Sequence, residues 1–232
     1  MRRSNNMRTG LLCAAALVAA FAAGSPGVAV SGSSRDTPPT ADPDRPEWKN
    51  APAIHADDDP MGAVVPHHQT EIRSRWTHDN LYFLFICHFE DLYLKPNPVT
   101  TAETNHLWDW DVAEVFVGSD MANIYRYKEF EISPRGEWVD LDIDLKHALP
   151  EGGWLWNSGF TSKTRIDEAN KVWYGEMKIP FSSIASQAPA VGQQFRVNFY
   201  RMQGTARKMI AWQPTHKKNY HVPEAFGMLE LK

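Results

Sequence analysis

Residues 105–116 combine aromatic rings with carboxylates around the start of a predicted strand. Trp108 and Trp110 precede the strand, and Asp111 and Glu114 lie beside its first residues. A flat indole ring can stack on the C–H face of a sugar ring, and a carboxylate can accept hydrogen bonds from hydroxyl groups. This chemistry suits sugar binding. The alternative is two core tryptophans with solvated acids beside them, because tryptophan is highly buried on average.

A second aromatic group lies in residues 210–227, on a long connection before the last predicted strand. It contains Trp212, His216, Tyr220 and His221. Long loops on a rigid scaffold commonly carry binding groups, which makes this segment a second candidate. The alternative is a surface loop with one tryptophan packed on the core.

Other reactive residue types have simpler interpretations. The alternating aspartates of 138–145 are typical of the solvent-exposed face of a strand. They do not by themselves indicate a glycosidase, because that enzyme needs two carboxylates that converge at a set separation. Asp42 and Asp44, or the acids of 57–59, could ligate a structural Ca²⁺ ion. That ion needs six or more placed oxygens, so a solvated acidic loop is the simpler interpretation. Cys87 has apolar neighbours and is expected in the core.

These residues must be positioned by strands, because most of the chain alternates with period two between turn signals. Residues 81–89 are nearly continuously apolar, as in a central strand buried on both faces. The remaining predicted strands are 71–76, 112–117, 124–133, 138–145, 160–166, 172–179, 195–201, 209–212 and 228–231. The pattern predicts an all-β fold, a two-sheet antiparallel β-sandwich of the jelly-roll kind, with about ten strands and little helix.

The N-terminal part divides into three predicted regions. Residues 1–30 hold an arginine-rich start, an apolar run over 11–23 and small residues, which is the pattern of a signal peptide. Residues 31–46 are rich in Ser, Pro and Asp and are predicted to be a flexible linker. The folded domain is predicted over 47–232. We expect an exported protein, either periplasmic or extracellular.

Charge and composition narrow the classes of partner. The formal net charge is −4, which argues against nucleic acid or an anionic membrane surface as the partner. No second apolar run is long enough for a transmembrane helix. Loss of the predicted signal peptide removes Cys13 and leaves Cys87 alone, so no internal disulfide is expected. We expect a monomer.

The order of residues along the chain resembles the family 9 carbohydrate-binding modules, within the wider group of DOMON-like sandwiches. The resemblance covers roughly 48–232. It is carried by Trp108, Asp111, Glu114 and Phe116, then Phe130, Pro134 and Gly136, then Trp173, Glu176, Ile179 and Pro180, then Gly192, Phe195 and Asn198, and finally Trp212, Pro214, Pro223, Phe226 and Gly227.

The resemblance implies a sugar held between two aromatic rings, with Ca²⁺ ions that often brace the fold. Trp108 matches one platform ring and Tyr220 the other, where relatives can carry tryptophan. Glu114 matches an acid that bonds sugar hydroxyls, and Glu131 falls where a basic ligand residue can stand in relatives. Arg201 could be a further donor, or it could form a structural ion pair. The predicted carbohydrate-binding residues are Trp108, Asp111, Glu114, Arg201, Trp212 and Tyr220.

The functional hypothesis is a secreted, non-catalytic protein that binds oligo- or polysaccharide, such as chain ends of plant-type polysaccharide, in support of polysaccharide breakdown. One alternative is a haem-binding DOMON-like domain, which needs an axial pair drawn from Met61, Met121, His88 and His106. Others are a glycoside hydrolase or lyase on the same sandwich, and a partner-binding sandwich whose sugar pocket has decayed.

Overall fold

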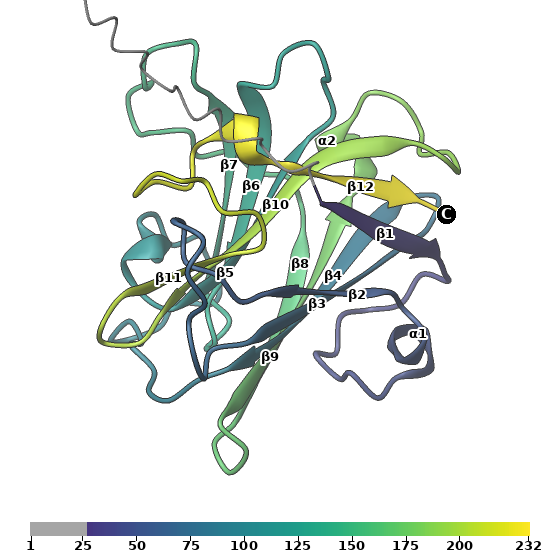
Figure 1. Cartoon of the computed structure of the whole chain (residues 1–232). Helices are drawn as coiled ribbons and strands as arrows, with labels where there is room; N and C mark the ends of the chain where they lie inside the picture. Colours follow the sequence, from purple (N-terminus) through teal and green to yellow (C-terminus); the bar gives the residue numbers. More distant parts are fainter. Residues whose placement is uncertain (1–26) are drawn as a thin grey trace, which may run out of the picture.

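The computed structural model describes residues 27–232, so most of the predicted signal peptide lies outside the described residues. In this part of the chain, twelve strands are joined by loops and by four helices of one turn each (Figure 1). The strands are β1 Val28–Ser33, β2 Ala53–Ala56, β3 Thr70–Trp76, β4 Asn80–His88, β5 Val112–Gly118, β6 Arg126–Ile132, β7 Trp138–Asp144, β8 Thr161–Asp167, β9 Val172–Pro180, β10 Gln194–Gln203, β11 Lys208–Ala211 and β12 Gly227–Leu231. The helices are α1 Pro46–Lys49, η1 Leu107–Asp109, α2 Phe181–Ile184 and η2 Pro223–Ala225.

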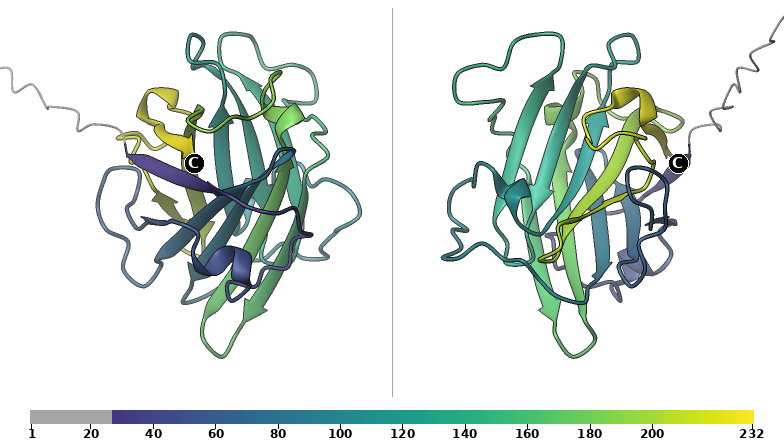
Figure 2. Two further views of the ribbon diagram at one scale, coloured as in Figure 1. Left: turned by 90° about the vertical axis from the view of Figure 1, so that its right-hand side faces the viewer. Right: turned by 60° about the vertical axis from the view of Figure 1, so that its left-hand side comes forward.

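The strands form two packed layers, which confirms the predicted all-β sandwich (Figure 2). The first layer, called sheet A, has the order β7-β6-β5-β10-β12-β1, with β11 beside β10. The second, called sheet B, has the order β1-β3-β4-β9-β8, with β2 beside β3. Strand β1 joins both layers, because Val28–Ser31 pair with β12 and Gly32–Ser33 pair with β3, in both cases parallel. The other described strand pairs are antiparallel.

The main core fills the space between the layers. Strand β4 turns Leu81, Phe83, Phe85 and Cys87 into it, and each is fully buried. The intervening residues of β4 face the outer side of sheet B, where Trp48 and other side chains cover them. The prediction of a strand buried on both faces is therefore confirmed. Burial raises the pKa of the Cys87 thiol to about 12, which agrees with its assignment to the core.

The outer face of sheet A carries a second buried cluster, and this face positions the candidate site. Phe116 of β5, Tyr127 of β6 and Tyr200 of β10 pack together there. Loops that precede β5, follow β7 and precede β12 supply further side chains to this cluster, among them Leu107, Trp154 and Tyr220. Successive side chains of these strands therefore alternate between two apolar faces, one between the sheets and one beneath these loops.

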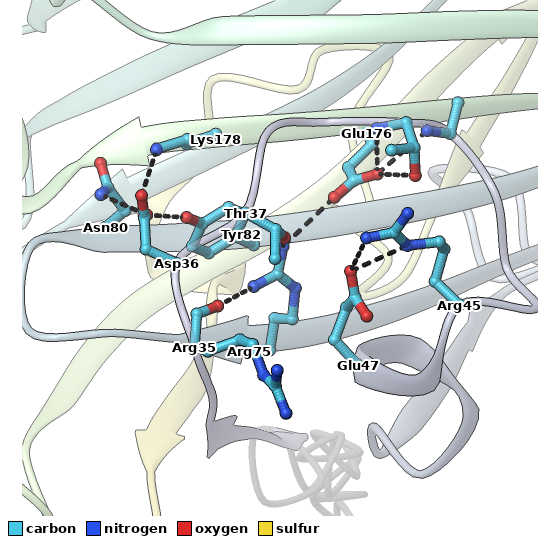
Figure 3. Close-up of polar contacts among 12 residues, drawn as sticks. Arg35, Asp36, Thr37, Arg45, Glu47, Arg75, Asn80, Tyr82, Glu176 and Lys178 are labelled. Carbon is cyan, nitrogen blue, oxygen red and sulfur yellow. Dashed lines mark hydrogen bonds and ion pairs between the residues drawn. The ribbon is translucent and has the colours of Figure 1, made fainter.

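The prediction of a flexible linker over 31–46 is wrong in the structure. Part of this segment forms β1, and the rest crosses the outer face of sheet B as an ordered strap (Figure 3). The backbone N–H groups of Thr40 and Ala41 donate to Glu176 Oε2 at 2.8 and 3.0 Å. Arg75, paired with Glu176 at 3.3 Å, donates to the Arg35 carbonyl at 2.9 Å.

The physical reason lies in that buried ion pair. Arg75 and Glu176 are each 1% exposed, and a buried pair is tolerated only when its remaining donors and acceptors are satisfied. The strap supplies partners for most of those groups from its backbone and from Thr37, and the guanidinium, whose Nε has no hydrogen-bond partner within residues 27–232, stacks over the Tyr82 ring at 3.6 Å. The folded unit therefore begins near Val28 and not at residue 47. No helix of the described residues is long and apolar enough to cross a membrane.

Candidate functional site

A cavity of about 600 Å³ lies on the outer face of sheet A. Its floor includes Glu114 and Phe116 of β5 and Glu129 of β6. Its walls come from three loops and include Trp108, Trp154 and Tyr220. The cavity thus combines aromatic rings with buried carboxylates, which is the combination that the sequence suggested for residues 105–116.

Trp108 stands on the one-turn helix η1 and is half-buried. Its neighbour Leu107 is fully buried and anchors the turn in the outer cluster. The Trp108 carbonyl accepts a hydrogen bond of 2.6 Å from Arg207, and its ring lies 4.8 Å from the His106 ring. The backbone of Trp108 is therefore held in place while part of its ring stays open to the cavity.

Tyr220 lines the same cavity but is only 7% exposed. Its ring stacks on Tyr200, with centroids 4.1 Å apart and planes 16° apart. Its hydroxyl donates to the Arg201 carbonyl at 2.8 Å and accepts from the Ile210 N–H at 2.9 Å. Burial raises the pKa of Tyr220, so the phenol stays protonated. Tyr220 is thus a buried part of the wall rather than a free ring.

Trp154 is the other half-buried tryptophan of the cavity, and sequence reasoning missed it. It lies in the loop between β7 and β8, directly after Gly152 and Gly153, which both have positive φ. A glycine pair followed by an aromatic residue between two predicted strands could have marked it as a loop side chain.

Three glutamates cluster at the floor of the cavity: Glu114 and Glu129 line it, and Glu131 lies beside them without lining it. Glu114, Glu129 and Glu131 each offer a carboxylate oxygen within 4.8 Å of the other two. All three are buried, and burial raises the pKa of Glu129 to about 7. Burial together with the neighbouring carboxylates raises the pKa values of Glu114 and Glu131 well above their usual range.

His221 is the imidazole beside this floor. Its Nε2 lies 4.0 Å from Glu129 Oε2, and its Nδ1 lies 2.7 Å from the Tyr127 hydroxyl. Burial lowers the pKa of His221 to about 4, so the ring is neutral at physiological pH. The histidine therefore adds a polar contact to the cavity but no positive charge.

Asp111, a predicted site residue, does not line this cavity. Its side chain is fully buried and accepts hydrogen bonds from the N–H groups of Tyr93 at 2.9 Å and Gly204 at 2.6 Å. Gln203 donates to it at 3.2 Å. The carboxylate thus fastens the segment after β4 to the turn after β10, next to the site but outside it.

Arg201 and Trp212 also lie outside the cavity. Arg201 alternates with Tyr200 along β10, so its fully buried side chain points between the sheets, where it donates to Thr70 at 3.2 Å. Trp212 packs edge-on against Phe199, with centroids 5.7 Å apart. Of the six predicted residues, the structure brings together Trp108, Glu114 and Tyr220.

Asp59 and Asp42, two acids that could ligate Ca²⁺ by their sequence, accept backbone hydrogen bonds in the structure. Asp59 accepts hydrogen bonds from the N–H groups of Met61 and Ala63, and Asp42 accepts one from Asp44. Each therefore stabilises a local turn. Within residues 27–232, only the three floor glutamates gather closely enough to ligate one ion. A structural Ca²⁺ ion stays a prediction.

Comparison with known proteins agrees with this architecture. The family model described as carbohydrate family 9 binding domain-like matches residues 44–232. An "Extracellular protein" of Arthroderma benhamiae is 24% identical over 178 residues, which are 69% of this chain and 78% of that protein.

Solved structures share the fold. A proposed carbohydrate-binding protein from Bacteroides uniformis superposes with a TM-score of 0.71 at 15% identity, over 90% of this chain and 100% of that one. A family 9 carbohydrate-binding module from Caldicellulosiruptor kristjanssonii in complex with cellotriose gives 0.65 at 13% identity, over 89% and 94%. Its complex with glucose gives 0.64 at 13% identity, over 89% and 96%. Because the family model spans most of the chain, this protein belongs to the carbohydrate family 9 binding domain-like family.

Proposed function

We propose that this protein is an exported, non-catalytic carbohydrate-binding protein that holds a sugar in the cavity on the outer face of sheet A. The observation that carries the proposal is a half-buried Trp108 beside a floor of buried carboxylates in a cavity of about 600 Å³. The ring offers a stacking face, and Glu114 and Glu129 offer acceptors for hydroxyl groups. Family membership supports binding rather than catalysis.

The sugar is held between Trp108 and a second ring of the same cavity. Tyr220 presents little surface, so Trp154 is the stronger candidate for the second ring. Cellotriose and glucose, which are the ligands in the related complexes, are the first ligands to test. Binding to such chains would retain the protein on polysaccharide during its breakdown.

Three matched tryptophan variants test the site by calorimetric titration with cellotriose. Trp108→Ala and Trp154→Ala should each weaken binding about threefold to tenfold or more, because aromatic contacts contribute about 0.5–1.5 kcal/mol beyond the burial of the ring. Trp156→Ala is the control, since Trp156 is also half-buried and near Trp154 but lies outside the cavity, under the Lys128 ammonium. Cellotriose affinity unchanged in both cavity variants would refute the site.

Export and lack of catalysis have separate tests. N-terminal sequencing of the secreted protein should find a first residue before Val28, because β1 begins there and belongs to both sheets. Incubation with a polysaccharide panel should release no product. An intact Met1 in the mature protein, or steady release of reducing ends, would contradict the respective claim.

A further inference from the structure

The three floor glutamates carry a cost to the stability of the fold unless protons or a bound cation neutralise them. Glu114 of β5 and Glu131 of β6 are direct cross-strand partners, and Glu129 lies two residues away on the same face of β6. Like charges directly opposite each other on a sheet are destabilising. Burial adds to the penalty, because a carboxylate taken out of water needs hydrogen bonds or a counter-charge.

No lysine or arginine of the described residues forms an ion pair with the three floor glutamates, although the exposed Lys218 lines the same cavity. His221 is the titratable base beside Glu129, and burial keeps it neutral. Arg207 acts on Glu114 from a distance, but its guanidinium donates to the Trp108 carbonyl and lies 3.8 Å from Asp111. Glu114 lines the cavity and is only 2% exposed, and its Oε1 has no hydrogen-bond partner within residues 27–232. An unpartnered carboxylate next to a cavity is an independent indication of a missing ligand.

The spacing of the carboxylates fits an ammonium group. One –NH₃⁺ donates three hydrogen bonds in tetrahedral directions, each about 2.8 Å long to a carboxylate oxygen. Three acceptors arranged in this way stand about 4.6 Å from one another by tetrahedral geometry. The observed oxygens all lie within 4.8 Å of one another.

The walls of the cavity suit an organic cation better than a bare ion. The cavity of about 600 Å³ is far larger than a bare ion, and its lining includes Trp108, Trp154 and Phe116. A metal ion would leave these rings without contact, and Ca²⁺ would need six or more oxygens. A neutral sugar would use the rings but would leave the acidic floor without a counter-charge.

We propose that the cavity selects a sugar that carries a protonated amino group, with the ammonium donating to Glu114, Glu129 and Glu131 and the sugar ring stacked on Trp108. This inference rests on the proposed function and names its ligand class. Amino sugars with a free amine match the acidic floor by their charge and the aromatic wall by their ring.

Protons provide a second signature of this binding mode. Without ligand, the raised pKa values of the three glutamates keep protons on the floor near neutral pH. An incoming ammonium favours the ionised carboxylates, so binding must release protons. The titratable groups around the floor and the cavity are Asp109, His106, Arg207, Lys218, His221, Tyr127, Tyr200 and Tyr220.

The test uses three β-1,4-linked trimers that differ only at C2: glucosamine with a free amine, N-acetylglucosamine, and glucose in cellotriose. Titration calorimetry at pH 6 in buffers of different ionisation enthalpy gives both affinity and proton release. We expect the glucosamine trimer to bind at least tenfold more tightly than either other trimer, with protons released for that trimer alone.

Isosteric variants assign the effect to the floor. Glu131→Gln and Glu129→Gln should each reduce the preference for the glucosamine trimer about tenfold while cellotriose still binds. Glu151→Gln, at an exposed position outside the cavity, is the control and should keep the wild-type preference. Thermal melts of all variants check folding.

The outcomes separate the two proposals. Equal or weaker binding of the glucosamine trimer, with cellotriose bound and lost in Trp108→Ala, overturns the amino-sugar inference and leaves the proposed function standing. Failure of all three trimers overturns both. Titration with calcium chloride alone provides the remaining test. If Ca²⁺ binds, Glu131→Gln abolishes that binding, and the protein shows no preference for the amine, the floor is a metal site and the inference is overturned.

Discussion

Tyr220→Phe separates the structural role of the Tyr220 hydroxyl from the role of its ring in the cavity wall. The hydroxyl bonds the Arg201 carbonyl at 2.8 Å and the Ile210 N–H at 2.9 Å. These two residues are partners across the β10–β11 ladder, so one hydroxyl ties both strands to the loop before β12. Phenylalanine keeps the ring on Tyr200 but leaves both backbone groups without this partner.

The size of the effect follows from those two buried groups. A buried donor or acceptor that loses its partner costs about 1–3 kcal/mol. Taking the lower part of that range for each group, we expect a loss of about 2–3 kcal/mol in the free energy of unfolding. For a domain of this size that lowers the melting midpoint by about 4–12 °C. Urea denaturation and scanning calorimetry measure it.

Cellotriose titration completes the assay, and its affinity should change less than twofold because the ring edge in the wall is retained. The control is Tyr125→Phe, whose hydroxyl donates to Glu224 at 2.7 Å on the exposed surface. It should shift stability by less than about 0.5 kcal/mol. A Tyr220→Phe protein as stable as wild type, or one that is stable but fails to bind cellotriose, would refute the description of Tyr220 as a structural wall.

Three further predictions concern stability. A chain that lacks Val28–Ser33 should melt earlier than one that begins at Gly27, in a thermal scan, because β1 is bonded to both sheets; equal midpoints would contradict this. Arg75→Ala should cost about 3–5 kcal/mol in urea denaturation, because it leaves Glu176 buried without its partner, and a loss below 1 kcal/mol would show the pair to be dispensable. Glu131→Gln should stabilise the protein at pH 7 but not at pH 4. The raised pKa keeps a proton on Glu131 in the folded protein, while the unfolded chain loses that proton above about pH 4.3. The wild type therefore loses stability as the pH rises, and the variant does not. A gap that is equal at both pH values would argue against the raised pKa.

The strands were predictable because their burial repeats every second residue. In 81–89, apolar residues at both odd and even positions indicated a strand that is buried on both faces. The structure places Phe83 between the sheets and Tyr82 beneath Arg75. In 124–133, a period of two puts Tyr127, Glu129 and Glu131 on one face of a strand, and they lie on one face of β6. Such predictions need only local geometry.

The N-terminal segment was misread because composition does not report long-range partners. Ser, Pro and Asp are typical of linkers, yet the strap over 34–45 is ordered by Arg75 and Glu176, which lie far away in the sequence. Nothing within residues 31–46 specifies that pair. Only the position of Arg75 on the outer face of β3, opposite β4 and near β9, creates the need for the strap.

Parity also explains why three predicted site residues lie elsewhere. Tyr200 faces the outer cluster, so its neighbour Arg201 must face the interior between the sheets. The alternation was visible in the sequence, but which parity faces the cavity depends on which side of sheet A the loops cover. That choice is set by the whole fold.

The glutamates of the floor also show that the pattern of a single strand does not reveal which of its faces is buried. Acids at alternate positions of a strand ordinarily mark its wet face, and Glu129 and Glu131 fit that rule when β6 is considered alone. Two long-range facts reverse the interpretation: Glu114 is the cross-strand partner of Glu131, and the loops bearing Trp154 and Tyr220 bury the face that carries all three. A wet strand face tolerates like charges because water screens them, whereas a buried one does not. The cluster therefore becomes informative only after the pairing is known, and its cost to stability is the reason to look for a positively charged ligand there.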